Sequence, residues 1–165
     1  MTEFDPGAVR TQFGLAVLLR QRPARQPWLT DIWEVHGAVV ETEPTPRTPT
    51  PIHSGADGVT LHRCGGLVLK LHVDEAESYY FNLLSERPAL YVITRKDDCQ
   101  RPLPFKVSAS FDEANAYAEA EEEAFPVPLP VEIIPAVERF VLTHYVPEKR
   151  TKRRRQNWKG QGPRS

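Results

Sequence analysis

Short runs in which apolar and polar side chains alternate occupy most of the first two thirds of the chain. In residues 89–95, for example, Leu90, Val92 and Thr94 would face one side of a strand and the residues between them the other. Comparable runs, rich in β-branched and aromatic residues, predict strands at residues 12–21, 31–42, 66–73, 78–84, 89–95 and 105–110. Gly37 lies inside the second run, where it indicates a β-bulge.

Two later segments carry apolar residues at helical spacing. The first begins at Ser110-Phe-Asp-Glu113, a capping box in which the serine oxygen and the glutamate each satisfy a free backbone N–H group, and it predicts a helix over residues 112–124. The second predicts a helix over residues 131–145, which Pro147 ends. Its apolar stripe consists of Ile133, Val137, Phe140, Val141, His144 and Tyr145.

This order of elements, strands first and helices afterwards, predicts an α+β fold. We expect a mostly antiparallel sheet or a small barrel of about six strands, followed by two C-terminal helices. Strands and helices do not alternate along the chain, which argues against a Rossmann or flavodoxin-type sheet. The 165 residues, 40% of them hydrophobic and 26% charged, correspond to one ordinary globular domain.

The chain has 16 prolines, about twice the usual share, and they mark its subdivisions. Four of them fall between residues 43 and 51, so we interpret residues 43–58 as one exposed loop that spaces two strands. A proline-rich ligand for another protein is the alternative for this segment. The expected organisation is a flexible N-terminus at residues 1–10, a single domain at residues 11–147 and a tail at residues 148–165.

Charge is distributed unevenly along the chain. The tail carries eight basic residues and one acidic residue, a net charge of +7, so the remaining residues carry −8 against a whole-chain charge of −1. With Trp158 as its one large apolar side chain, the tail is expected to be disordered when free. Lys152-Arg-Arg-Arg155 is suited either to an acidic protein surface or to the phosphates of a nucleic acid.

Most sequence signatures of catalysis are missing. The chain has no glycine-rich phosphate loop, no H-E-x-x-H, no C-x-x-C and no G-x-S-x-G, which argues against nucleotide-dependent enzymes, zinc hydrolases and α/β hydrolases. It also has no apolar run of the length that spans a membrane, and we expect no signal peptide because no hydrophobic segment follows a basic one near residue 1. We therefore expect a cytoplasmic protein whose two cysteines, Cys64 and Cys99, are reduced.

Two small groups of residues remain as candidates for chemistry. His62, Cys64 and His72 would offer three metal ligands if their strands were adjacent, but no fourth ligand is close in sequence. Asp74, Glu75 and Glu77 could serve a small enzyme as acid and base, although a turn is usually hydrated. We interpret both groups as structural or surface residues and predict no catalytic site, no metal and no cofactor.

Several stretches together resemble one protein family. They are residues 72–93 (HVDEAESYYFNLLSERPALYVI), 15–19 followed by Pro27-Trp28, 33–35 (WEV), 127–130 (VPLP), Phe140-Val, His144-Tyr and 152–155 (KRRR). The resemblance covers residues 13–155, with the proline-rich segment as an insertion. The family consists of small bacterial proteins of unknown function that are encoded beside formate dehydrogenase genes, and some members are labelled molybdopterin-guanine dinucleotide biosynthesis protein A.

That label does not transfer to this chain, because the nucleotidyltransferase it names needs a glycine-rich loop after its first strand. Here Pro23 and Trp28 follow the first predicted strand instead. What the resemblance implies is an accessory protein that assists maturation or assembly of a molybdenum- or tungsten-dependent formate dehydrogenase. Its partner would be a formate dehydrogenase subunit or a maturation factor, and a nucleic-acid-binding regulator that acts through the basic tail is the alternative.

Two surfaces are expected to contact that partner. The folded one would lie on the predicted sheet around Glu75, Glu77, Tyr79, Tyr80 and Asn82. The second would be the tail, which would steer association electrostatically. Its contact residues would be Lys149, Arg150, Lys152, Arg153, Arg154 and Arg155.

Overall fold

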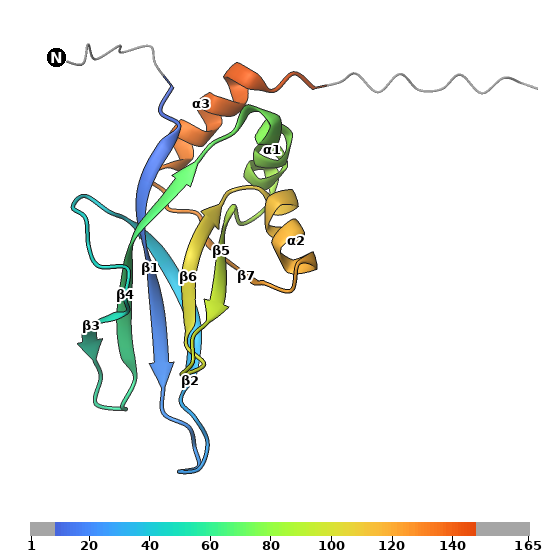
Figure 1. The fold of residues 1–165 in the computed structure, drawn as a ribbon. Coiled ribbons are helices and arrows are strands. Elements are labelled where there is room, and N and C mark those ends of the chain that lie inside the picture. Colours follow the sequence, from blue (N-terminus) through green and yellow to red (C-terminus); the bar gives the residue numbers. More distant parts are fainter. Residues whose placement is uncertain (1–8, 148–165) are drawn as a thin grey trace, which may run out of the picture.

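The computed structural model describes residues 9–147, which form two antiparallel sheets and three α-helices (Figure 1). The larger sheet has the strand order β2-β1-β4-β3. Its strands are β1 (Gln12–Arg22), β2 (Ile32–Val40), β3 (Thr50–Ser54) and β4 (Thr60–Lys70). The smaller sheet has the order β6-β5-β7 and consists of β5 (Ala89–Lys96), β6 (Pro102–Ser108) and β7 (Glu123–Pro128). The predicted α+β fold is confirmed, with open sheets in place of a barrel.

The three helices gather at one end of the molecule (Figure 1). They are α1 (Ala76–Leu84), which directly follows the 3-10 turn η1 (Val73–Glu75), α2 (Phe111–Glu119) and α3 (Ile134–His144). α1 and α3 pack against each other, with the rings of Tyr80 and Tyr145 4.8 Å apart. None of the helices in the described part is long and apolar enough to cross a membrane.

One hydrophobic core joins the two sheets to the helices. β1 and β4 contribute alternate residues such as Leu15 and Leu69, β5 contributes Leu90, and α3 contributes Phe140. Each of these side chains is almost completely buried. Alternate residues along β1 and β5 therefore form one face of each strand, which packs against the core, as the sequence pattern predicted. The predicted bulge in β2 is also present: the register with β1 shifts opposite Gly37, between Leu18 and Leu19.

The strand predicted at residues 78–84 is wrong, because these residues form most of α1. The buried residues of α1 include Ala76, Tyr79 and Asn82, which recur every three residues and lie on one helix face. The apolar residues Phe81 and Leu84 point outward instead. Because the polar Asn82 points inward while the apolar Phe81 and Leu84 point outward, the hydrophobic pattern of this helix resembles the alternation of a strand.

The two proline-rich segments were also misassigned. Residues 50–54, predicted as part of a loop, form the edge strand β3, and residues 123–128, predicted as a helix end and linker, form the edge strand β7. Proline lacks the N–H group that a central strand needs, but an edge strand tolerates it on its free side. The described chain thus has seven strands, and β7 separates the two C-terminal helices. The N-terminus to residue 8 and the tail at 148–165 lie outside the described residues.

Candidate functional site

The five residues predicted as a folded contact surface lie on η1 and α1, and only part of this set is accessible. Glu77 is exposed and Tyr80 is half-buried against Tyr145. Tyr79 and Asn82 are buried, and Glu75 is half-buried with its carboxylate turned toward α2. The prediction of a sheet surface is therefore wrong, and the accessible part of it is one helix face.

Asn82 holds the C-terminal half of α1 to the smaller sheet. Its side-chain amide donates to the carbonyl oxygens of Ala89 at 2.7 Å and Ala109 at 2.9 Å. Its Oδ1 atom accepts a hydrogen bond from the Ala89 N–H at 2.8 Å. Three backbone groups at the buried or half-buried edge of the smaller sheet are satisfied in this way.

Tyr79 connects α1 to the core and to the end of β4. Its ring meets Phe140 edge-on at 5.9 Å, and its hydroxyl accepts a hydrogen bond from the His72 N–H at 3.0 Å. Burial raises the pKa of Tyr79 to about 12, so its hydroxyl stays protonated at neutral pH. Tyr79 is thus a structural residue.

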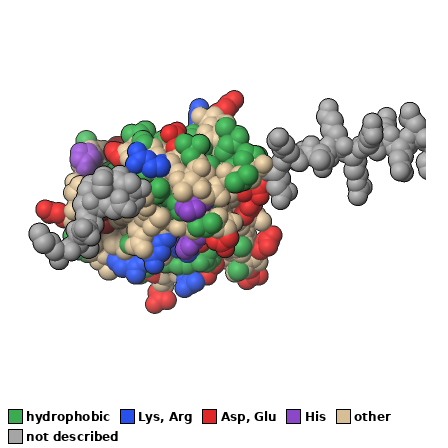
Figure 2. Space-filling model, turned by 90° about the horizontal axis from the view of Figure 1, so that it is seen from above, with side chains coloured by type: hydrophobic (Ala, Val, Ile, Leu, Met, Phe, Trp, Pro, Cys, Tyr) green, Lys and Arg blue, Asp and Glu red, His purple; other side chains and the backbone are tan. Residues whose placement is uncertain are grey.

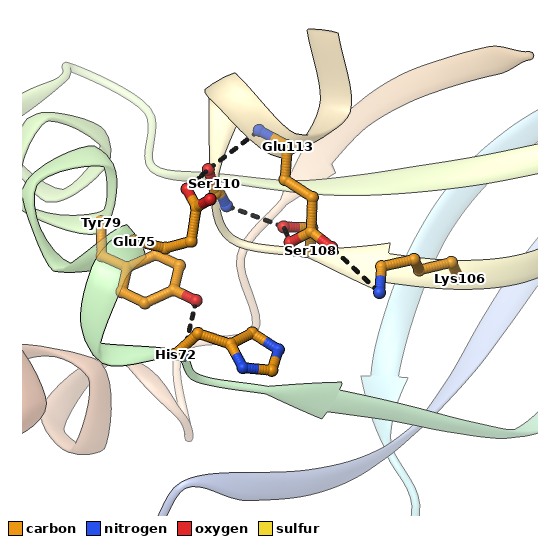
Figure 3. A network of polar contacts seen from close by, with 7 residues as sticks. All are labelled: His72, Glu75, Tyr79, Lys106, Ser108, Ser110 and Glu113. Carbon is orange, nitrogen blue, oxygen red and sulfur yellow. Dashed lines mark hydrogen bonds and ion pairs between the residues drawn. The ribbon is translucent and has the colours of Figure 1, made fainter. Parts of the chain in front are cut away.

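A network of serines and glutamates joins η1, α1, β6 and α2 (Figure 3). Ser110 caps α2 as predicted: its Oγ accepts from the Glu113 N–H at 3.1 Å, and it donates to the Glu75 carboxylate at 2.5 Å. Ser110 Oγ also lies 3.0 Å from Ser78 Oγ. In a full capping box the Glu113 side chain would accept a hydrogen bond from the Ser110 N–H. Here Ser108 Oγ accepts that hydrogen bond instead, at 3.0 Å.

Glu113 carries the network out to the surface. Its carboxylate accepts from Ser108 Oγ at 2.7 Å and pairs with the Lys106 ammonium at 2.9 Å. The hydrogen bond to Glu113 raises the pKa of Lys106, so this side chain is fully charged at neutral pH. Since these groups satisfy one another, the network fixes α2 against α1 and β6.

A cleft of about 240 Å³ opens beside this network, between β4, β6 and α2. Leu67 and Val107 are its buried wall residues. Its basic groups come from three separate segments of the chain: Arg47 from the proline-rich loop, Lys70 and His72 from the end of β4, and Lys106 from β6. Glu113 is the one carboxylate among its lining residues. We call this feature the basic cleft.

The proline-rich loop that supplies Arg47 is held against β4. The Glu41 carboxylate accepts from the backbone N–H and the hydroxyl of Thr45 and from the Gly66 N–H, while the Gly65 N–H donates to Pro46. Burial acts to raise the pKa of Glu41, but these hydrogen bonds outweigh it and hold the pKa below its ordinary value. The loop is therefore clasped to the sheet by a charged carboxylate at neutral pH.

A second hollow, of about 470 Å³, lies between α1, the start of β5 and the start of α2. Phe81 and Phe111 line it and are 59% and 57% exposed, and Tyr91 meets the Phe111 ring at 6.0 Å. Arg87 also lines this hollow and forms no ion pair with another residue between 9 and 147. We call this feature the aromatic groove.

Exposed apolar side chains are common at the helical end of the molecule. Figure 2 looks down on this end and shows hydrophobic side chains at the surface beside acidic ones. Leu84 on α1 and Leu142 on α3 are 64% and 84% exposed. Glu77, Phe81 and Leu84 recur at helical spacing, so they share the outer face of α1 next to the aromatic groove.

The three residues considered as metal ligands are not brought together. His62 packs beside the Trp33 ring at 4.7 Å, and its Nε2 atom lies 2.8 Å from Gln21 Oε1. Burial lowers the pKa of His62. His72 lies beyond the opposite end of β4, and residues 9–147 contain no group of three histidine, cysteine or acidic side chains arranged for a metal.

The two cysteines differ in accessibility, which predicts a labelling pattern. Cys64 is buried and burial raises the pKa of its thiol to about 11, whereas Cys99 is exposed. Because the thiolate is the reactive form, we expect a maleimide at pH 7.5 to modify Cys99 quickly and Cys64 only after unfolding. Mass spectrometry after brief labelling, with Cys99→Ser as the control, measures this. Rapid single labelling of Cys99→Ser would show that Cys64 is accessible.

Sequence reasoning missed the aromatic groove and the basic cleft. The signal for the groove was Asn82, a polar residue at the spacing of buried neighbours, which turns Phe81 outward. The signal for the cleft was Gly65-Gly66, which lets a second segment lie directly on β4. The six basic residues predicted in the tail, from Lys149 to Arg155, lie outside the described residues.

Comparison with known proteins gives one family assignment. A family model described as "Protein of unknown function (DUF3305)" matches residues 14–155, which include every described element except the first two residues of β1. No curated protein matches the chain. A search of solved structures likewise found no match.

Proposed function

The chain belongs to the DUF3305 family of proteins of unknown function, and from its surface we propose that it is a non-catalytic accessory protein that binds a protein partner through the aromatic groove. The observation that carries this proposal is the exposure of Phe81 and Phe111, each more than half accessible, on opposite walls of one hollow. Large aromatic side chains are common in the energetically important centres of protein interfaces. Exposed apolar surface of this kind marks interaction sites.

The walls of the aromatic groove are held in fixed positions, which favours binding. Asn82 ties α1 to the backbone of Ala89 and Ala109, and Ser110 ties α2 to Ser78 on α1. A partner would therefore meet a surface that needs little ordering of its backbone. Less conformational entropy is lost when such a preformed surface binds.

The proposed occupant is a partner segment with a large apolar side chain for the groove and an acidic side chain near it. Phe81 and Phe111 would contact the apolar group, and Arg87 would contact the acid. Glu77, on the same helix face as Phe81, would lie at the rim and favour a partner with a basic group there. Of the five residues that the sequence predicted for the folded contact surface, Glu77 and the half-buried Tyr80 remain part of the surface proposed here.

For the identity of the partner we propose a formate dehydrogenase subunit or one of its maturation factors. The support is the resemblance of residues 13–155 to proteins encoded beside formate dehydrogenase genes. The charge of the tail supports a second, electrostatic contact through Lys149, Arg150 and residues 152–155. Such a contact would raise the rate of association more than the lifetime of the complex.

The double substitution Phe81→Ser, Phe111→Ser tests this proposal. We expect about a tenfold or greater loss of affinity for the dehydrogenase partner, because two aromatic contacts disappear. The measurement is nuclease-treated affinity purification from the native host, with dehydrogenase subunits and maturation proteins quantified by mass spectrometry. A chain that ends at Glu148 separates the contribution of the tail.

Leu142→Ser is the matched control, because it removes an exposed apolar residue from α3, outside the aromatic groove. Equal recovery of the dehydrogenase proteins by the control and the double variant would contradict the groove as the docking site. Unchanged formate dehydrogenase activity after deletion of the gene would contradict the accessory role itself. Recovery of nucleic acid alone, lost when the tail is removed, would support the nucleic-acid-binding alternative.

A further inference from the structure

We propose that the basic cleft between β4, β6 and α2 binds a small phosphorylated molecule. This inference does not depend on the protein partner proposed above, because α2 separates the two features. Phe111 and Asp112 line the aromatic groove, whereas Glu113 and Tyr117 line the basic cleft. On a helix these pairs point to different sides.

The charge of the basic cleft favours a dianion. Lys106 is already balanced by Glu113 at 2.9 Å. Arg47 and Lys70 form no ion pair with any residue between 9 and 147, so two positive charges of the cleft have no partner within the described residues. A phosphate monoester carries a charge between −1.5 and about −2 at pH 7, which matches them.

The basic groups are positioned by the fold, even though their tips are in solvent. Arg47 lies on a loop that Glu41 clasps to β4, and its Cγ atom would be only 3.0 Å from a Cβ atom added to Gly66. Gly66 also has a positive φ of 72°. The absence of a side chain there leaves the space that Arg47 occupies beside the cleft.

Lys106 is positioned from the opposite wall. Its ammonium pairs with Glu113, which also accepts a hydrogen bond from Ser108 (Figure 3). The ammonium lies 5.8 Å from the centre of the Tyr117 ring. Since Lys106 has three N–H donors, it can keep Glu113 and still donate to a phosphate oxygen. Lys70 and His72 come from the wall formed by the end of β4. Donors would therefore approach the phosphate from several sides.

The remaining lining indicates the rest of the ligand. Phe105 and Tyr117 are half-buried aromatic residues of the cleft, and Leu67 and Val107 are buried apolar ones. A volume of about 240 Å³ is suited to a phosphate joined to one small ring or a short apolar group. It is small for a dinucleotide, since pockets for drug-sized ligands begin at about 300 Å³. The expected class is a small phosphate monoester with an apolar or planar body.

Titration of the full chain with phenyl phosphate at constant ionic strength tests the proposal, with calorimetry or NMR as the readout. We expect saturable one-to-one binding, weaker binding of inorganic phosphate, and none of phenol. Benzoate is titrated in the same way, to show whether the basic cleft prefers a phosphate or a carboxylate. Arg47→Gln and Lys70→Gln should each weaken phenyl phosphate binding by about fivefold to tenfold, as expected for loss of a charge-assisted hydrogen bond.

Arg139→Gln is the matched control, because it removes an exposed basic side chain on α3 and should leave the affinity unchanged. Non-saturable binding, or equal binding by all three variants, would overturn the proposal, as would tighter binding of benzoate than of phenyl phosphate. Recovery of the protein partner by Arg47→Gln and Lys70→Gln is measured in parallel. It should stay normal, so failure of this proposal is distinguishable from failure of the docking proposal.

Discussion

Replacing Asn82 with leucine is expected to lower the free energy of unfolding by about 3 kcal/mol. Leucine has the same branched arrangement of four side-chain heavy atoms as asparagine, but it cannot form hydrogen bonds to the carbonyl oxygens of Ala89 and Ala109 or to the Ala89 N–H. A buried backbone group left without a partner costs about 1 to 3 kcal/mol. The site is buried in the fold, so water cannot readily replace the amide.

Urea denaturation followed by circular dichroism measures this loss as a shift of the midpoint at unchanged slope. Asn115→Leu is the control, because Asn115 is exposed on α2 and its amide donates to Glu119 on the same helix. We expect the control to change stability by less than about 0.5 kcal/mol. An Asn82→Leu protein as stable as the control would mean that the amide does not hold α1 to the smaller sheet.

The same residue explains why the sequence of α1 resembles that of a strand. The strand predictions for β1 and β5 succeeded because alternate residues of each strand face the core, and the hydrophobic pattern reports that directly. In α1 the polar Asn82 is buried for its hydrogen bonds, and the apolar Phe81 is exposed. Hydrophobic periodicity cannot distinguish a buried polar clamp from a surface residue. The exception is informative, because departures from the pattern concentrate where a surface has a role other than folding.

Other features depend on contacts that no local pattern contains. β3 exists because Thr50–Ser54 can pair with β4, and its proline hid that pairing from propensity arguments. The basic cleft combines Arg47, Lys70 and Lys106, which lie far apart along the chain and meet only once the two sheets are in contact. The serine half of the predicted capping box at Ser110 was confirmed, because this cap depends only on residues of the first helical turn. Local signals were therefore sufficient for the central strands and the helix cap, and insufficient for α1, for the edge strands β3 and β7 and for the surfaces.

Substituting Gly65 with alanine is expected to destabilise the protein by about 2 kcal/mol and to release the proline-rich loop from β4. A Cβ atom at Gly65 would overlap Thr45 Oγ1 and would lie 2.7 Å from the Thr45 carbonyl oxygen and 2.8 Å from Glu41 Oε1. A side-chain hydroxyl can rotate away, but the backbone carbonyl can move only with its loop. The clasp formed by Glu41, Thr45 and Pro46 should therefore open.

Thermal unfolding gives the stability change, and limited proteolysis after Arg47 by trypsin reports whether the loop has detached. Gly37→Ala is the matched control, because a Cβ atom at Gly37 in β2 would meet nothing within 4 Å. If the clasp positions Arg47, Gly65→Ala should also weaken phenyl phosphate binding as much as Arg47→Gln does. Wild-type stability and cleavage rate in Gly65→Ala would show that the loop does not lie on β4. Normal phosphate binding by a Gly65→Ala protein with a released loop would show that the clasp does not prepare the cleft, because Arg47 would then bind without being held.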